Sequence, residues 1–356
     1  MIKMTDIAGA REVLGNYPDV YLVYDRNLAD VASKLEGMCL ATKAVDATEQ
    51  DKSMDTVLEI CRWLLMLGAD RGATLVALGG GIVTDLCGFA ASIYKRGIRF
   101  GFIPTTLLAQ VDAAIGGKNG VNLDAYKNMI GVIREPEFTL LIPSLLSTLP
   151  RREWLSGAAE LLKTFIIDNT GGRYEEAVAV LPSAYSVLPS AHSVLPSAYS
   201  VIPSAYSVIP SECERISPLL LAAASVKERI VAADLYERGE RRKLNLGHTF
   251  AHAIERRARL SGRDISHGEA VAMGILLAAR ASERLGISSE GLEERLRRDW
   301  ATVGLPTECP FPPSDLAADM TKDKKADGDK VHFVLIRGIG DVVVMPLGVR
   351  EVIDLL

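Results

Sequence analysis

The chain has 356 residues, of which 48% are apolar and 24% charged, a composition typical of a folded globular protein and unlike that of a disordered one. Its net charge of −5, and the lack of any basic run interleaved with aromatic residues, argue against a nucleic-acid partner. The length favours two domains over one.

Neither a leader peptide nor a membrane span is indicated by the sequence. The first residues, MIKMTDIAGAREV, contain no apolar core, and the longest apolar run, at 270–279, is too short to cross a bilayer. The five cysteines are scattered and form no C-x-x-C pair, so we expect reduced thiols. We therefore expect a cytoplasmic protein with no membrane partner.

The first 150 residues alternate short apolar runs with amphipathic stretches. Apolar runs occur at 20–25, 74–81 and 98–106, and helix-like stretches occur at 56–70 and 82–94. This alternation is typical of a parallel α/β sheet. We predict that residues 1–150 form a Rossmann-like α/β domain that binds NAD.

From residue 151 onward the apolar residues recur every three or four positions, which predicts helices at 157–167, 218–237, 247–260 and 268–286. We predict that residues 151–356 form a mainly α-helical domain that binds a metal and the substrate. The change of pattern at TLPRRE, 148–153, predicts one active site where the two domains meet.

A seven-residue repeat fills residues 181–211, from LPSAYSV to the partial copy that opens IPSEC. Proline at every seventh position disfavours a regular helix, so we expect an extended or poorly ordered surface loop. A partner-binding role for this insert is the less favoured alternative.

A turn with three glycines, Gly79–Gly81, separates the expected strand at 74–78 from the helix at 82–94. Such a turn directs backbone N–H groups at a pyrophosphate, although a plain tight turn is equally compatible with the pattern. Asp85 lies one helical turn further along, where it can cap the helix or hold a ribose or nicotinamide group. Asp25 and Asn27 end the first strand, where they can contact a ribose or form only an Asx turn.

Three histidines gather within a short stretch. His248 and His252 share one face of a helix, and His267 begins the next one. Catalytic zinc sites take three protein ligands, often with a carboxylate among them, and Glu160 on an apolar helix face is the best candidate. A simple Glu160–Lys163 pair on a surface helix is the alternative, and the spacing leaves open whether His252 binds the metal or the substrate.

Several cations lie beside these motifs in an otherwise acidic chain. Each one alone is most often a solvated surface charge. Together they predict an anionic small-molecule ligand that carries phosphate and carboxylate groups. They are Arg96, Lys118, Lys127, Lys163, Lys227, Arg241 and the Lys324–Lys325 pair.

Seven motifs in this order resemble the 3-dehydroquinate synthase family: GGGIVTDLCGF, IPTTLLAQVDAAIGGK, YKNMIG, LSTLPRREWLSGAAELLK, LNLGHTFAHAIE, SHGEAVAMG and DKKADG. The resemblance implies a lyase of the shikimate pathway that makes 3-dehydroquinate and phosphate from 3-deoxy-D-arabino-heptulosonate 7-phosphate. It further implies transient oxidation by NAD+, β-elimination of phosphate, re-reduction and aldol closure, in a homodimer in which Arg96 reaches the neighbouring site.

The resemblance also implies a role for individual residues. It assigns Zn2+, or Co2+, to Glu160, His248 and His267, and it assigns His252 to the substrate. The other substrate residues are Arg96, Asp112, Lys118, Asn128, Lys163, Lys227, Arg241, Asn245 and Lys325. The NAD+ contacts are Asp25, Glu49, Lys52, Gly80, Gly81, Asp85, Thr105, Thr106, Lys127 and Thr148.

Three other functions fit part of this pattern. Metal-dependent polyol or alcohol dehydrogenases combine a glycine turn with metal-binding histidines, but a simple alcohol leaves the cations unexplained. Sister sugar phosphate cyclases form 2-deoxy-scyllo-inosose or valiolone-type rings. A catalytically silent NAD-binding scaffold whose repeat recruits a partner would bind nucleotide without turnover.

Overall fold

The computed structural model describes residues 1–124, 126–186, 211–320 and 330–356. The chain divides into two compact units, one of Met1–Leu149 with Ala191–Ala224, and one of Pro150–Ser190 with Ser225–Leu356. The division at 149/150 falls where the sequence changes character. The assignment of Ala191–Ala224 to the first unit has no counterpart in the sequence pattern, because a single helix, α7 (Ser211–Ala233), runs across the second division.

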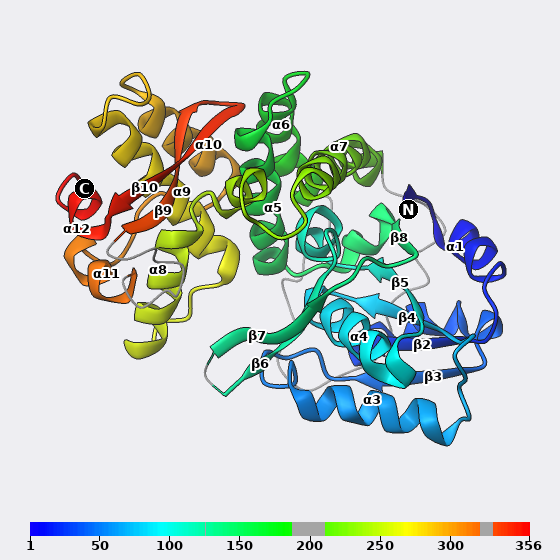
Figure 1. Ribbon diagram of the computed structural model, residues 1–356. Coiled ribbons are helices and arrows are strands. Elements are labelled where there is room, and N and C mark those ends of the chain that lie inside the picture. Colours follow the sequence, from blue (N-terminus) through cyan, green and yellow to red (C-terminus); the bar gives the residue numbers. More distant parts are fainter. Residues whose placement is uncertain (125, 187–210, 321–329) are drawn as a thin grey trace. The chain divides into compact units, whose positions relative to one another are not determined.

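The first unit is built on a six-stranded sheet of order β1-β8-β5-β4-β2-β3 in which every pair of neighbours is parallel. This confirms the expected parallel α/β fold (Figure 1). The strands are β1 (Ile2–Met4), β2 (Val20–Asp25), β3 (Ala41–Val45), β4 (Thr74–Gly79), β5 (Arg99–Pro104) and β8 (Phe138–Leu141).

Helices cover both faces of this sheet, because parallel strands are apolar on both sides. Alternate residues of β4 show this division: Leu75 and Ala77 pack toward α3 and α4, whereas Val76 and Leu78 pack toward α1 and α2. The helices are α1 (Ile7–Leu14), α2 (Ala29–Ser33), α3 (Met54–Met66) and α4 (Gly81–Ile93).

Short 3-10 and π segments and one hairpin complete the first unit. The antiparallel hairpin of β6 (Lys118–Leu123) and β7 (Tyr126–Ile133) was not expected, because Asn and Gly are poor strand formers. The 3-10 segments are η1 (Arg26–Leu28), η2 (Glu36–Met38), η3 (Tyr94–Arg96) and η5 (Pro143–Thr148), and the π segment is η4 (Ala109–Ala113).

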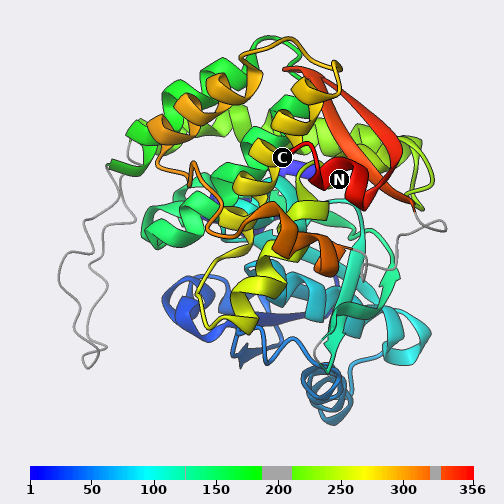
Figure 2. The same cartoon turned by 90° about the vertical axis from the view of Figure 1, so that its left-hand side faces the viewer.

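The second unit is mainly helical, as expected, with one antiparallel pair of strands added. Helix α9 packs against α5, α8 and α10, which appear as green, yellow and orange ribbons in Figures 1 and 2. The elements are α5 (Arg151–Ile167), α6 (Arg173–Ser186), η7 (Glu240–Asn245), α8 (His248–Leu260), α9 (His267–Arg284), α10 (Leu292–Val303), α11 (Pro313–Met320), β9 (Lys330–Gly338), β10 (Asp341–Gly348) and α12 (Val349–Ile353).

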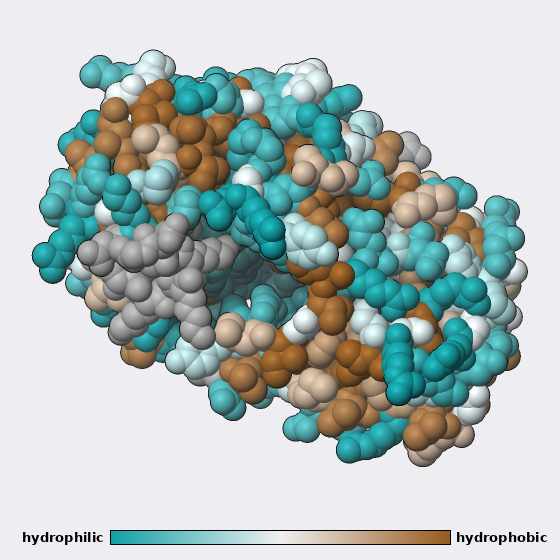
Figure 3. All heavy atoms as spheres, viewed as in Figure 1, coloured by the Kyte–Doolittle hydropathy of each residue, from teal (hydrophilic) through white to brown (hydrophobic). Residues whose placement is uncertain are grey.

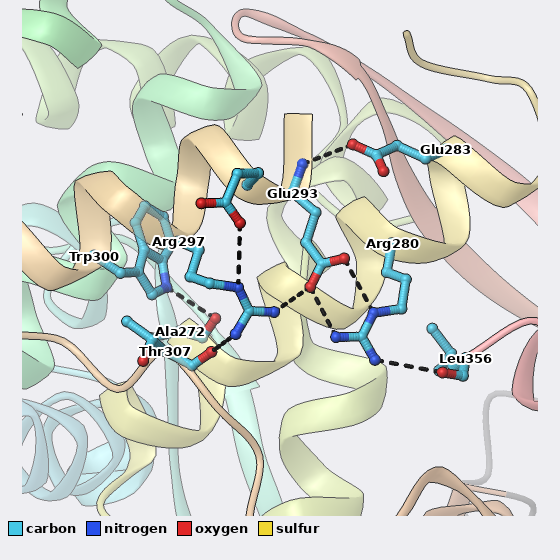
Figure 4. A network of polar contacts seen from close by, with 9 residues as sticks. Ala272, Arg280, Glu283, Glu293, Arg297, Trp300, Thr307 and Leu356 are labelled. Carbon is cyan, nitrogen blue, oxygen red and sulfur yellow. Dashed lines mark hydrogen bonds and ion pairs between the residues drawn. The ribbon is translucent and has the colours of Figure 1, made fainter. Parts of the chain in front are cut away.

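A shared carboxylate joins α9 to α10. Glu293 accepts hydrogen bonds from Nη2 and Nε of Arg280, at 2.8 and 3.0 Å, and a further one from Arg297 (Figure 4). Beside this network, the buried Trp300 donates its indole N–H to the carbonyl of Ala272 at 3.0 Å. Two guanidinium groups thus hold one acid between the helices.

The expectation of a loop across 181–211 is wrong at both ends of the repeat. Helix α6 continues through the first copy to Ser186 with Pro182 inside it, and α7 begins at Ser211. Proline removes one helical hydrogen bond, but burial of Leu181 and Ala184 offsets that cost. Residues 187–210 lie outside the described part of the chain.

Candidate functional site

The glycine turn of the first unit forms the start of α4. Gly80 is the N-cap and provides no side-chain hydrogen bond, so the first N–H groups of the helix have no side-chain cap. A Cβ atom on Gly80 would lie 3.0 Å from the methyl group of Thr106, and one on Gly81 would lie 3.0 Å from Cβ of Ala113. The turn therefore leaves no room for side chains, and a helix N-terminus of this kind attracts anions.

The carboxyl ends of three neighbouring strands meet at this turn. Gly79 at the end of β4 pairs with Pro104 of β5, and the N–H of Thr105 donates to the carbonyl of Gly79 at 3.0 Å. The end of β2 places Asp25 at the same edge of the sheet. There, Asp25 accepts hydrogen bonds from the backbone and side-chain nitrogens of Asn27, both at 3.0 Å, which is the Asx turn raised as the alternative reading.

Lys52 connects two other residues that the sequence singled out. Its side chain is nearly buried, and its Nζ lies 2.5 Å from Oδ2 of Asp85 and 2.6 Å from Oδ1 of Asn128. Asn128 has a positive φ of 54°, a conformation that Asn tolerates better than most residues. Lys52 thus links α4 to the hairpin through charge-assisted hydrogen bonds.

Asn122 completes this cluster and was missed by the sequence analysis. Its backbone N–H donates to the carbonyl of Lys52 at 2.9 Å, and its side chain donates to Oε1 of Glu49 at 2.9 Å. Its Oδ1 accepts the N–H of Asn128 at 2.9 Å. The structure therefore brings together Glu49, Lys52, Asp85 and Asn128. Asn122 hydrogen-bonds to three of them, Glu49, Lys52 and Asn128.

The remaining candidates of the first unit lie on separate elements. Lys127 precedes Asn128 on β7, Asp112 lies in the π segment η4, and Thr148 ends η5. Lys118 is an exposed residue at the start of β6. Arg96 follows α4 with a positive φ of 67°.

In the second unit, Glu160, His248 and His267 converge. Each provides one possible ligand atom, and these atoms lie within 4.8 Å of one another. Nε2 of His267 is 3.3 Å and Nε2 of His248 is 3.6 Å from the same carboxylate oxygen, Oε1 of Glu160. Among the described residues, this is the group of His, Cys, Asp and Glu side chains arranged to hold a metal ion.

Two glycines set the positions of these ligands. A Cβ on Gly268, next to His267, would lie 2.2 Å from Cα of Ser156, so α9 begins in direct backbone contact with α5. The N–H of Gly268 also donates to Oγ of Ser156 at 3.1 Å. Gly247 precedes His248 with φ of 76°, and a Cβ there would lie 2.9 Å from the backbone nitrogen of Ile275. Close packing on α9 therefore fixes where both histidines emerge.

The donor set fits a zinc ion. Tetrahedral zinc with bonds of about 2.1 Å separates neighbouring ligand atoms by about 3.4 Å, close to the two distances measured here. Oε2 of Glu160 pairs with Lys163, whereas the buried Oε1 faces only the two imidazoles and accepts no hydrogen bond of good geometry from the described residues, a costly state that a metal ion would relieve. One carboxylate and two imidazoles are also ligand types that zinc prefers.

The three side chains perturb one another electrostatically. Burial opposes ionisation of Glu160, but Lys163, His248 and His267 hold its pKa well below the usual value. Burial and the Lys163 ammonium lower the pKa of His248 to about 3. Burial would also lower the pKa of His267, but Glu160 and Glu255 raise it to about 10. The three side chains therefore form a carboxylate, one neutral imidazole and one imidazole that would have to give up its proton to bind a metal ion.

Lys163 and His252 flank this group. Nζ of Lys163 lies 2.5 Å from Oε2 of Glu160, and both side chains are buried, which excludes the surface ion pair considered as the alternative. The His252 ring centroid is 5.8 Å from that of His248, and His252 does not belong to the converging group. His252 thus lies beside the group without belonging to it.

The segment before α8 carries two more candidates, Arg241 and Asn245. Arg241 is buried, and its Nη1 donates to the carbonyl of Leu235 at 2.8 Å. Asn245 donates to Oε1 of Glu237 at 2.5 Å. Lys227 is buried near the end of α7, and Lys325 lies outside the described residues.

Asp234 organises this loop and was also missed. Its carboxylate accepts the backbone N–H groups of Gly239, Arg238 and Arg241 at 2.6, 3.0 and 3.1 Å. The N–H groups of Arg238 and Gly239 lower the pKa of Asp234. A single Asp in a polar stretch carries no recognisable sequence signal, so only the folded loop shows its role.

Apolar helices and cysteines were also singled out in the sequence. Among the described residues, no helix combines the length and apolarity needed to cross a membrane. Four described cysteines are free thiols: Cys39, Cys61, Cys87 and Cys309.

Comparison with known proteins then decides the family. Residues 42–156 match the N-terminal model and residues 199–326 the C-terminal model of 3-dehydroquinate synthase. The chain is 38% identical over 338 residues to the 3-dehydroquinate synthase of Acidithiobacillus ferrooxidans (strain ATCC 53993 / BNL-5-31), covering 91% of this chain and 84% of that protein. The chain belongs to the 3-dehydroquinate synthase family. A second family member, from Pyrococcus abyssi (strain GE5 / Orsay), is 41% identical over 295 residues, covering 83% and 78% of the two chains.

A solved structure has a similar fold. The 2-epi-5-epi-valiolone synthase of Streptomyces hygroscopicus subsp. jinggangensis 5008 was solved with NAD+ and Zn2+ bound. It superposes with a TM-score of 0.81 at 26% identity, covering 100% of this chain and 95% of that one. The motif resemblance to the 3-dehydroquinate synthase family is thus confirmed by sequence relatives, and the fold of a sugar phosphate cyclase by structure.

Proposed function

We propose that this chain converts 3-deoxy-D-arabino-heptulosonate 7-phosphate into 3-dehydroquinate and phosphate, a carbon–oxygen lyase reaction of the shikimate pathway. Membership of the 3-dehydroquinate synthase family supports the reaction. The observation that carries the chemistry is the convergence of Glu160, His248 and His267 on one point.

NAD+ and Zn2+, or Co2+, are the proposed cofactors. When bound, NAD+ accepts a hydride from the substrate and later returns it, and the metal ion lowers the pKa of the hydroxyl group that is oxidised. Glu160, His248 and His267 would hold the metal. The start of α4 at Gly80–Gly81, which has no side-chain cap, would hold the pyrophosphate of NAD+, because the N–H groups at a helix N-terminus attract anions.

The remaining residues act on the substrate. Oxidation makes the neighbouring C–H bond acidic, so phosphate leaves by β-elimination. The buried cations Lys227 and Arg241 are suited to hold the phosphate and carboxylate groups in place. Lys163 balances the charge of Glu160. Return of the hydride, ring opening and an aldol step then close the carbocycle without net oxidation.

Two further parts of the proposal concern assembly and compartment. The β6–β7 hairpin exposes Leu123, Tyr126, Met129 and Ile133, each more than 40% accessible, and brown apolar side chains appear there in Figure 3. Exposed apolar groups on a hairpin support a homodimer, which sedimentation would test. The free thiols support a reducing compartment such as the cytoplasm.

One assay separates the candidate functions. The full chain is incubated with NAD+, zinc and the heptulosonate phosphate, and released phosphate and NADH are both followed. We expect stoichiometric phosphate without lasting NADH. Sustained NADH would instead support a dehydrogenase, and no reaction with nucleotide bound would support a silent scaffold.

The same assay tests the metal site. We expect His267→Ala to abolish phosphate release and to lower the zinc content, because it removes one of three ligands. His332→Ala, on β9 of the same unit, is the matched control and should retain both. Full zinc retention in His267→Ala would reject this ligand set.

A further inference from the structure

Both candidate histidine ligands are oriented in the same way. Each turns Nε2 toward Oε1 of Glu160 and Nδ1 toward a different oxygen atom. For His248, Nδ1 lies 3.1 Å from the carbonyl oxygen of Leu246, in its own loop. For His267, Nδ1 lies 3.6 Å from Oε1 of Glu255, an ion-pair distance just beyond a hydrogen bond.

This orientation selects one tautomer. An imidazole that binds a metal is neutral and keeps one N–H group. If Nε2 points its lone pair at the metal, that N–H lies on Nδ1 and donates to the oxygen beside it. The backbone carbonyl serves His248 in this way, and the carboxylate of Glu255 is placed to serve His267.

Glu255 is well placed for such a role. It lies on α8 two helical turns after His248, and its side chain is only 12% exposed. It therefore connects the helix that carries one ligand to the first residue of the helix that carries the other. Its negative charge also raises the basicity of Nε2 of His267, the ring nitrogen that would face the metal.

We propose that Glu255 is a positioning residue that holds the Nδ1–H of His267, so that Nε2 of this ring completes the metal site with Glu160 and His248. This inference rests on the proposed function, since it assumes that the three residues bind zinc. It assigns a role to a carboxylate outside the three converging residues.

The test measures zinc affinity of the full chain without substrate or NAD+, by competition with a chromogenic chelator. We expect Glu255→Ala to weaken zinc binding about 10- to 100-fold, the usual cost of losing an outer carboxylate. Glu255→Gln keeps an acceptor oxygen but loses the charge, so its affinity should lie between those of Glu255→Ala and the unchanged chain. The visible spectrum of the cobalt-loaded protein should shift in both variants.

Glu293→Gln is the matched control. It is the same exchange in the same unit, at a side chain that is 15% exposed and paired with Arg280 and Arg297. It should lower stability and leave zinc affinity and the cobalt spectrum unchanged. If loss of packing alone weakened zinc binding, Glu293→Gln and Glu255→Gln would weaken it by similar amounts.

The outcomes distinguish this inference from the proposed function. If the unchanged chain binds zinc and releases phosphate, but both Glu255 variants bind zinc equally tightly with the same cobalt spectrum, the positioning role is wrong. If the unchanged chain binds no zinc at all, the proposed metal site itself is wrong. Circular dichroism shows whether either Glu255 variant has lost its fold. If Glu255→Ala does not fold, the zinc affinity of Glu255→Gln, whose side chain has nearly the same size and shape as Glu, tests the positioning role.

Discussion

At the scale of single residues, Gly268 controls how closely helix α9 approaches helix α5. It lies beside His267 and brings the start of α9 against the backbone of α5, the helix that carries Glu160. The contact is with backbone atoms, which cannot swing aside as a side chain can. The separation of two metal ligands therefore depends on a residue that has no functional group.

We predict that Gly268→Ala destabilises the protein by about 1–3 kcal/mol and lowers its zinc content, because the new methyl group forces α9 away from α5. Urea unfolding and metal analysis measure the two effects. Gly338→Ala in the same unit is the control, since a Cβ there meets no atom within 4 Å. Stability and zinc content equal to those of the unchanged chain would show that the contact is not tight.

The candidate residues differ in how far the sequence could reveal them. Glu160, His248 and His267 were predictable because a carboxylate on an apolar helix face and clustered histidines are unusual. Asn122, Asp234 and Glu255 were not, because polar residues of these types are common in loops and on helix surfaces. Their roles arise from backbone groups and side chains that only folding brings near them.

At the scale of elements, helices α5, α8 and α9 supply the three candidate ligands, and α10 packs against α9, to which Glu293 joins it. Burial opposes the charge on Glu293, but Arg280 and Arg297 lower its pKa below the usual value. A carboxyl group with a lowered folded-state pKa stabilises the fold above its unfolded pKa, and this contribution disappears as pH falls through the folded pKa.

We therefore predict that Glu293→Gln lowers the free energy of unfolding by about 1–2 kcal/mol at neutral pH, and by progressively less below about pH 4. Chemical denaturation of both proteins across this pH range would measure the difference. Glu294→Gln on the same helix is the control, because Glu294 is exposed and its partners lie 3.9 Å away. A cost that persists unchanged at low pH would mean that charge is not the cause.

Helices and buried strands followed from apolar periodicity, whereas the hairpin β6–β7 and the helical ends of the repeat did not. Strands with Asn and Gly, such as β6, form because a partner strand pairs with them. Pro182 is tolerated because the neighbouring residues of α6 are buried. Both results depend on contacts between residues far apart in the sequence, which local sequence patterns cannot predict.

At the scale of the whole molecule, the candidate residues divide between two units, each with its own role. The turn at Gly80–Gly81 and the Lys52 cluster belong to the first, and the metal ligands belong to the second. The sequence predicted two parts and their classes, but not that α7 is shared between them. A continuous amphipathic helix shows no break in its pattern where its neighbours change.

We predict that zinc and NAD+ protect different parts of the chain from hydrogen exchange. Zinc should protect the first turns of α8 and α9, and NAD+ should protect the start of α4 and the residues after β5. At a concentration of about 100 times Kd, binding slows exchange about 100-fold where it blocks local opening. Mass spectrometry of peptide fragments measures this, and zinc protection confined to the first unit would contradict the assignment.

The pairing of Glu160 with Lys163 also matters while the chain is being made. The ribosome releases α5 well before either histidine, so this acid is part of the growing chain long before its histidine partners are made. The ammonium group of Lys163, one turn away on the same helix, is made at nearly the same time as Glu160 and can pair with it at once. The nascent protein thus carries a built-in counterion, and the acid can be enclosed without waiting for the metal.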